Sequence, residues 1–156
     1  MTARPVAVLS ALVVTALLAL AAACSPSSEA VTASDPYVKA MPAGEMTAAF
    51  VTLTNTTSSD IEVTAAHTDA AESTELHEMT MDGSAMVMQQ VDAITIPANG
   101  SVTLEPGGFH LMLMGLTEAL EPGAEITITL TLSTGDELTL TAVARDMANA
   151  QESYHP

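Results

Sequence analysis

Apolar and polar residues alternate with a period of two along much of the chain. In residues 125–132 every second position is Ile or Leu, and the positions between them are Thr or Glu. Residues 137–143 repeat the alternation, and the composition of 133–136 is typical of a hairpin turn. Because successive side chains of a strand point to opposite faces, this pattern predicts two strands, each with one buried and one solvated face.

Six further segments have strand character and are separated by residues that favour turns. They are 46–54, 61–66, 74–81, 85–90, 101–104 and 109–116, with glycine or proline in several of the intervening stretches. Beyond the apolar amino end, no segment shows the sustained period of about 3.6 residues that marks a helix. Short strands at this spacing predict an all-β protein built as an antiparallel sandwich or barrel.

The amino end has the order of an export signal. Arg4 provides a positive start, residues 6–23 are apolar or small, and Cys24 follows at once. A secretory signal has this order. Cys24 after three alanines also resembles the lipobox of bacterial lipoproteins, in which that cysteine is lipidated and becomes the first residue. A simple cleaved signal and an uncleaved membrane anchor are the alternatives.

The chain is therefore predicted to divide into four parts. Residues 1–23 are the signal peptide, and residues 24–36 are the lipidated cysteine and a flexible tether. Residues 37–145 form one β-sandwich domain, and residues 146–156 are a mobile tail. The domain would be exported and anchored by lipid to the outer face of the cell membrane, and we expect it to be monomeric.

Charge excludes several classes of partner. The chain has 3 Lys and Arg against 19 Asp and Glu, a formal net charge of -16. Nucleic acid and anionic lipid are recognised by clustered basic side chains, so neither is an expected partner, and membrane contact is expected only through the lipid. No nucleotide-binding glycine loop or nucleophile-elbow motif is present, and we expect no enzyme activity.

Methionine and histidine gather in one part of the chain. Of the ten methionines, six lie in the window from residue 77 to residue 114, together with His77 and His110. In a strand over 109–116, His110, Met112 and Met114 would share one face. His77 and Met79 would have the same relation on another strand.

Imidazole and thioether are neutral, soft ligands. They suit Cu(I), whereas Ca²⁺ and Mg²⁺ prefer oxygen and Zn²⁺ rarely takes Met. An electron-transfer blue-copper site needs a Cys thiolate, and the only cysteine here is Cys24. Any single Met remains more typical of a core residue, so the case for a metal rests on the repetition of His-x-Met.

The spacing of four of these residues resembles a known family. His77, Met88, His110 and Met112 follow the pattern H-x10-M-x21-H-x-M, which is typical of the periplasmic copper(I) chaperones called PCuAC. The residues around this pattern also resemble those of the family, including Pro106-Gly-Gly108 before the second histidine. The resemblance covers roughly residues 37–145.

This resemblance implies a cupredoxin-like Greek-key sandwich that holds one Cu(I) per chain. The implied ligands are His77, Met88, His110 and Met112, with Met79 as a replacement for or supplement to Met88. The implied role is delivery of copper to a cuproprotein, most simply a cytochrome c oxidase subunit or its assembly factors. Phe50 and Phe109, where relatives are expected to carry Tyr, should not touch the metal.

Other interpretations stay open at this point. The protein could store or detoxify copper, or it could be a lipoprotein whose sandwich binds another protein without any metal. Met147 and His155 in the tail are candidates for a second copper site. His67 is expected to be structural or solvated.

Overall fold

The computed structural model describes residues 30–146, which form ten strands and no helix. The strands are β1 (Val31–Lys39), β2 (Thr47–Asn55), β3 (Ile61–His67), β4 (Ala71–Asp82), β5 (Ala85–Gln90), β6 (Ile94–Ile96), β7 (Ser101–Leu104), β8 (Phe109–Leu116), β9 (Glu125–Leu132) and β10 (Glu137–Arg145). No helix in this part of the chain is long and apolar enough to cross a membrane. The all-β prediction is confirmed, and β5, β7, β8 and β9 have the bounds that the sequence predicted.

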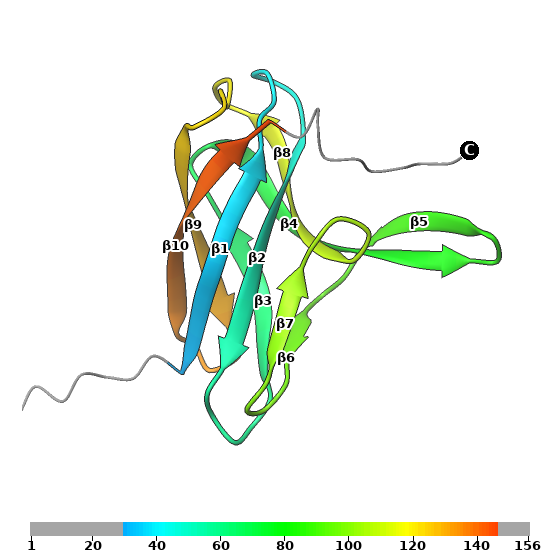
Figure 1. Ribbon diagram of the computed structural model, residues 1–156, viewed down its shortest axis with the longest axis vertical. Helices are drawn as coiled ribbons and strands as arrows, with labels where there is room; N and C mark the ends of the chain where they lie inside the picture. The colour runs from blue at the N-terminus through cyan, green and yellow to red at the C-terminus, as the bar shows by residue number, and fades with distance from the viewer. Residues whose placement is uncertain (1–29, 147–156) are drawn as a thin grey trace, which may run out of the picture.

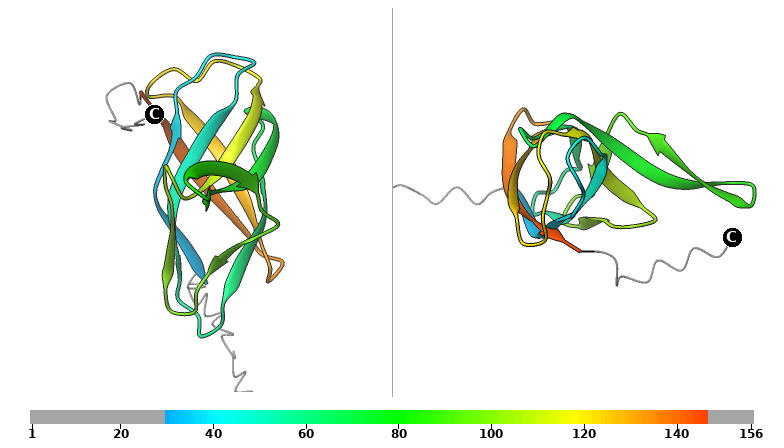
Figure 2. Two further views of the ribbon diagram at one scale, coloured as in Figure 1. Left: turned by 90° about the vertical axis from the view of Figure 1, so that its right-hand side faces the viewer. Right: turned by 90° about the horizontal axis from the view of Figure 1, so that it is seen from above.

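The strands form one sheet that curves around a core (Figures 1 and 2). Its order is β5-β4-β8-β2-β1-β10-β9-β3-β6, and β7 pairs with β2 beside the main path. The curvature brings two parts of the sheet face to face, as in a sandwich. The core between them contains fully buried aliphatic residues from both parts, including Leu53, Leu111, Leu113, Ile128 and Leu130.

The structure corrects the expectation of a purely antiparallel sheet. β1 and β10 pair in parallel, with Tyr37 opposite Val143 and Lys39 opposite Arg145, whereas the other pairs are antiparallel. The sheet is therefore mixed. The parallel pair was missed because its first strand was not recognised in the sequence.

The predicted tether over residues 24–36 was wrong for its last part, because β1 begins at Val31. Val31 is buried and pairs with Asn55, so the domain starts before residue 37. A break in the register between Ser34 and Tyr37, with Asp35 at a φ of 51°, interrupts the alternation within β1. That break removed the period-two signal. The short strand β6 was missed as well, although Ile94 and Ile96 are fully buried.

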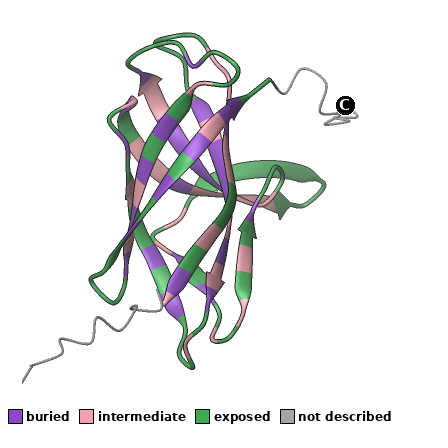
Figure 3. Ribbon diagram, turned by 60° about the vertical axis from the view of Figure 1, so that its left-hand side comes forward, coloured by how far each residue is buried: buried purple, intermediate pink, exposed green. Residues whose placement is uncertain are grey.

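The β4–β5 hairpin projects from the body of the domain (Figure 1). Every residue of β5 is exposed, as its colour in Figure 3 shows. Asp82 pairs with Ala85 across a two-residue turn, in which Gly83 has a φ of 65°. Glycine is favoured at this first central position of a type II′ turn. The tight turn fixes which residues of β4 and β5 face one another.

A buried amide fastens the end of β2 to its neighbours. Asn55 is fully buried, and its Nδ2 donates to the carbonyl oxygens of Ser59 at 2.8 Å and Ile96 at 3.1 Å. Its Oδ1 accepts from the backbone N–H of Thr57 at 2.9 Å and from the Thr57 hydroxyl at 2.8 Å. All four hydrogen-bonding positions of the amide, two protons and two lone pairs, are thus used, and they join the β2–β3 loop to β6.

We predict that Asn55→Ala lowers the free energy of unfolding by about 2 kcal/mol, because buried partners lose their hydrogen bonds. Urea denaturation of the soluble domain measures this. Thr52→Ala is the matched control on the same strand, since the Thr52 hydroxyl forms a solvent-exposed hydrogen bond of 3.3 Å with the Thr103 hydroxyl. It should change stability by less than about 0.5 kcal/mol. Equal effects of the two changes would contradict the assigned role of Asn55.

Candidate metal centre

The register of β4 and β8 brings the two histidines together. His77 lies directly opposite His110 in this antiparallel pair, and residues opposite one another project from the same face of the sheet. The ring centroids are 5.7 Å apart, with an interplanar angle of 43°. The face in question is the outer one, because the alternating residues Leu76 and Leu111 point into the core.

His110 is held in one protonation state by its surroundings. Its Nδ1 lies 3.1 Å from the carbonyl oxygen of Gly108, which can only accept, so Nδ1 carries the proton. Burial lowers the pKa of His110, and the nearby His77 lowers it further, against an opposing contribution from the Gly108 carbonyl. The ring is therefore neutral at pH 7, and Nε2 has a free lone pair. That Nε2 lies 3.2 Å from Sδ of Met88.

His77 is oriented in a similar way by a carboxylate. Its Nε2 lies 2.8 Å from Oε2 of Glu75, two residues earlier on the same face of β4. Nε2 carries the ring proton and donates it in a hydrogen bond to Glu75, so Nδ1 is the nitrogen with the free lone pair. This Nδ1 is buried and has no hydrogen-bond partner in the described structure. A buried polar atom without a partner is costly, and a metal ion would satisfy it.

Three methionines share the face of the two rings and lie at different depths. Met112 lies opposite Glu75 and Ala48 on the same outer face as His110, and it is 8% exposed. Met88 comes from the projecting strand β5 and is 48% exposed. Met79 lies opposite Met88 in the hairpin. Met88 is thus the ligand candidate that faces solvent, whereas His110 and Met112 are buried and form the floor of the site beneath it.

This group offers nitrogen and sulfur lone pairs without charge. Within residues 30–146, no three or more His, Cys, Asp and Glu side chains gather in a way that could hold a metal ion. Sites for Zn²⁺ or Ca²⁺ are built from such side chains, so the donor set here suits a soft ion instead. The residues present therefore fit Cu(I), with two imidazole nitrogens and thioether sulfur as donors.

Three features of the site were missing from the sequence interpretation. Glu75 orients His77, the Gly108 carbonyl orients His110, and Phe50 packs beside His110 with ring centroids 6.4 Å apart. The Glu75 role could have been inferred, because residues two apart share a face of a strand. The Phe50 contact depends on β2 lying next to β8, which no local pattern reveals.

Aromatic packing continues away from the site. The Tyr37 ring lies 5.0 Å from that of Phe50, and the Arg145 guanidinium carbon lies 4.4 Å from the centroid of Tyr37. Such contacts each contribute on the order of 1 kcal/mol. Phe50 connects them to His110 from the β2 side of β8, whereas His77 lies on the β4 side.

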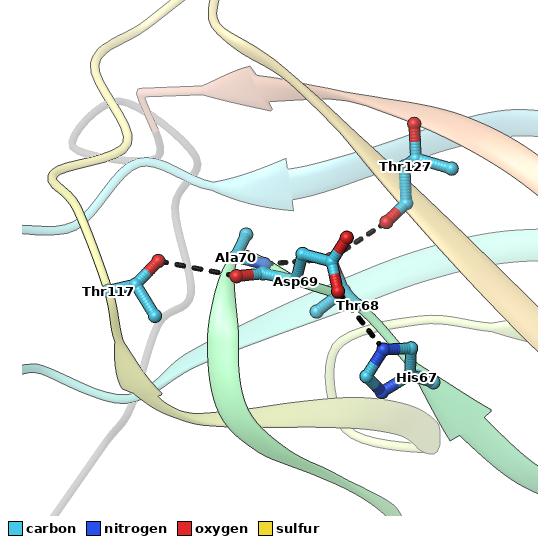
Figure 4. Close-up of polar contacts among 6 residues, drawn as sticks. All are labelled: His67, Thr68, Asp69, Ala70, Thr117 and Thr127. Carbon is cyan, nitrogen blue, oxygen red and sulfur yellow. Dashed lines mark hydrogen bonds and ion pairs between the residues drawn. The ribbon is translucent and has the colours of Figure 1, made fainter.

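His67 lies apart from this group, at the start of the connection to β4 (Figure 4). Its Nε2 is 3.2 Å from Oδ1 of Asp69, and both side chains are exposed. The Thr68 hydroxyl donates to the Thr127 carbonyl at 2.7 Å, and that of Thr117 donates to the Asp69 carbonyl at 3.4 Å. These bonds fix the loop beside an open hollow of about 520 Å³. His67 is solvated, as expected.

Other predicted residues cannot be placed. Cys24, Met147 and His155 lie outside the described residues, so their lipidation and metal-binding roles stay predictions.

Comparison with known proteins shows the family. The model described as "Putative lipoprotein LpqE-like" matches residues 31–144. The chain belongs to this family. It is also 39% identical over 137 residues to "Putative lipoprotein Lxx21020" of Leifsonia xyli subsp. xyli (strain CTCB07), covering 86% of this chain and 82% of that protein. The start of the match agrees with the observed start of β1.

Solved structures similar to this LpqE-like chain include copper-binding domains. The solution structure of CuI-DR1885 from Deinococcus radiodurans is 34% identical, with a TM-score of 0.64 over 83% of this chain and 89% of that one. The apo form of the same protein is 33% identical, with a TM-score of 0.59 over 93% and 95%. The copper-bound PCuAC domain from PmoF2, at 21% identity and a TM-score of 0.63 over 75% and 93%, shares the fold. The cupredoxin-like sandwich is thereby supported.

We predict that His110 of the metal-free protein titrates below about 6.5, the ordinary pKa of histidine. Burial disfavours the charged imidazolium and lowers the pKa of the ring. On acidification, the unfolded chain therefore takes up the proton at a higher pH than the folded chain. The stability that His110 contributes is therefore present above about pH 6.5 and is lost as pH falls through the folded pKa. Imidazole NMR signals followed against pH measure the shift. A pKa for His110 at or above 6.5 would contradict the assigned neutral state.

Proposed function

We propose that this LpqE-like protein is an extracytoplasmic Cu(I) carrier that binds one Cu(I) through His77, Met88, His110 and Met112. One observation carries the proposal. The unpartnered Nδ1 of His77 and the basic Nε2 of His110 belong to facing rings, and Sδ of Met88 lies beside the second ring. Copper-bound relatives with the same fold support the choice of metal.

The donor set favours the reduced ion. Thioether sulfur and neutral imidazole stabilise Cu(I), and the described residues contain no cysteine for the His₂Cys site of a blue-copper protein. The ligands leave the single charge of Cu(I) uncancelled. The negative charge of Glu75 partly balances this positive charge through His77, because the carboxylate accepts a hydrogen bond from Nε2–H.

The role that follows is delivery of copper outside the cytoplasm. Met88 is half exposed on a projecting strand, so one ligand of the proposed site is open to an incoming acceptor. A lipid at Cys24 would hold the domain on the outer face of the cell membrane. The acceptor would be a cuproprotein, with the copper centres of cytochrome c oxidase as the first candidate. The domain would act as a monomer.

We predict that His77→Ala and His110→Ala each weaken Cu(I) binding by at least about tenfold, or about 1.4 kcal/mol. Anaerobic competition with a colorimetric Cu(I) chelator measures the affinity of the soluble domain. Met88→Leu and Met112→Leu should also weaken binding while conserving side-chain volume. Met46→Leu is the matched control, because Met46 is an exposed methionine outside the group.

Unchanged affinity in both histidine variants would remove these residues from the site. Absence of competition by the unmodified protein would leave the metal-free, protein-binding interpretation. Mixing the copper-loaded domain with the apo copper domain of an oxidase subunit then tests delivery. Copper should move to the acceptor, and retention would indicate storage instead.

We predict that Glu75→Ala weakens Cu(I) binding by about tenfold, because loss of a partner that orients a ligating histidine has effects of this size. Glu75→Gln should lose less affinity than Glu75→Ala, since the amide oxygen of Gln can still accept a hydrogen bond from His77. The control is Glu78→Ala, which removes a carboxylate opposite Phe109 on the other face of β4. Equal losses for Glu75→Ala and Glu78→Ala would indicate a general charge effect and contradict the orienting role.

A further inference from the structure

One face of the β4–β5 hairpin carries a ladder of soft ligands. Three cross-strand pairs share this face: His77 with Gln90, Met79 with Met88, and Met81 with Met86. They share it because positions two apart on each strand project to the same side. The ladder runs from the proposed copper site at the base of the hairpin to the turn at its end. The terminal pair, Met81 and Met86, has no part in the site described above.

The two terminal methionines are exposed to solvent. Met81 is 63% exposed and Met86 is 48% exposed, on a segment that projects from the domain (Figures 1 and 3). Single exposed apolar residues are ordinary on protein surfaces. Two methionines directly opposite one another beside a turn are a different arrangement, because packing in a core does not account for either. Both residues are therefore accessible from solvent.

The geometry of the pair suits one soft cation. Directly opposed residues in an antiparallel pair have Cβ atoms about 5 Å apart, and flexible methionine side chains can close the remaining gap. The only charged side chains of the hairpin from residue 78 to residue 90 are Glu78 and Asp82, so a cation is not repelled. Thioethers select Cu(I) over hard ions.

We propose that Met81 and Met86 form a second, weaker Cu(I) site at the end of the β4–β5 hairpin, separate from the inner site. The inference deepens the proposed copper-carrier function and shares its metal, but it rests on different residues. With two thioethers and no imidazole, this outer site offers fewer and weaker donors than the inner one. Met79 lies between the inner and the outer site, next to His77 and to Met81 on the same face of β4.

The test is an anaerobic titration of the soluble domain, labelled with ¹³C at the methionine methyl groups, with Cu(I). The first equivalent should shift the signals of Met88 and Met112. Further Cu(I) should shift those of Met81 and Met86 together, with an affinity at least about tenfold weaker. In Met81→Leu and in Met86→Leu the later phase should be lost, while the inner affinity stays within about twofold. Both residues are exposed, so neither change should disturb folding.

Met46 provides the internal control, because it is 51% exposed and lies outside the hairpin. Its signal should not move in the range where those of Met81 and Met86 do. A parallel shift of Met46 would show unspecific thioether binding and overturn the second site. So would the absence of any Met81 and Met86 shift after the inner site is filled. If the first equivalent moved neither Met88 nor Met112, the carrier proposal would fail, whereas a joint Met81 and Met86 response would still support the outer site.

Discussion

The burial of β8 on both of its faces is the constraint on which the rest of the site depends. Leu111 and Leu113 point into the core and are fully buried, whereas His110 and Met112 point outward and are also buried. The inner pair fixes the position of the strand through close packing, which tolerates little displacement. The outer pair therefore sits on a rigid floor. A metal ligand on a strand held in this way keeps its direction without a metal to hold it.

The rigid floor contrasts with the hairpin above it. β5 pairs only with β4 among the described strands, and all its residues are exposed, so little packing opposes its motion. The proposed site thus joins His110 and Met112 from the buried strand β8, and His77 opposite them on β4, to Met88 from the exposed strand β5. Opening the site then requires displacement of β5 alone, because β4 stays paired with β8 as far as Glu78. Such a division suits an ion that must be held and later given up.

The sequence predicted the parts of this molecule in which the period-two pattern is uninterrupted. β9 and β10 alternate between aliphatic residues and Thr, so both strands and their buried faces were found. The bounds of β8 were also found, and the shared face of His110 and Met112 follows from strand geometry. β1 was missed because its register breaks at Asp35 and only Val31 and Val38 are well buried. The contact of Phe50 with His110 was beyond local patterns, because it depends on strands distant in sequence pairing as neighbours.

Electrostatics explains why neutral ligands and an acidic chain belong together. The buried imidazole of His110 favours its neutral form, so no proton has to be expelled before a cation binds at neutral pH. The overall charge of -16 lies mainly on exposed carboxylates, where it attracts cations over a distance but is screened by salt. Selectivity then has to arise at close range. Hard ions are attracted by the same surface charge, yet they find mainly nitrogen and sulfur at His77, His110 and Met88, so the donor atoms and not the charge decide in favour of a soft ion.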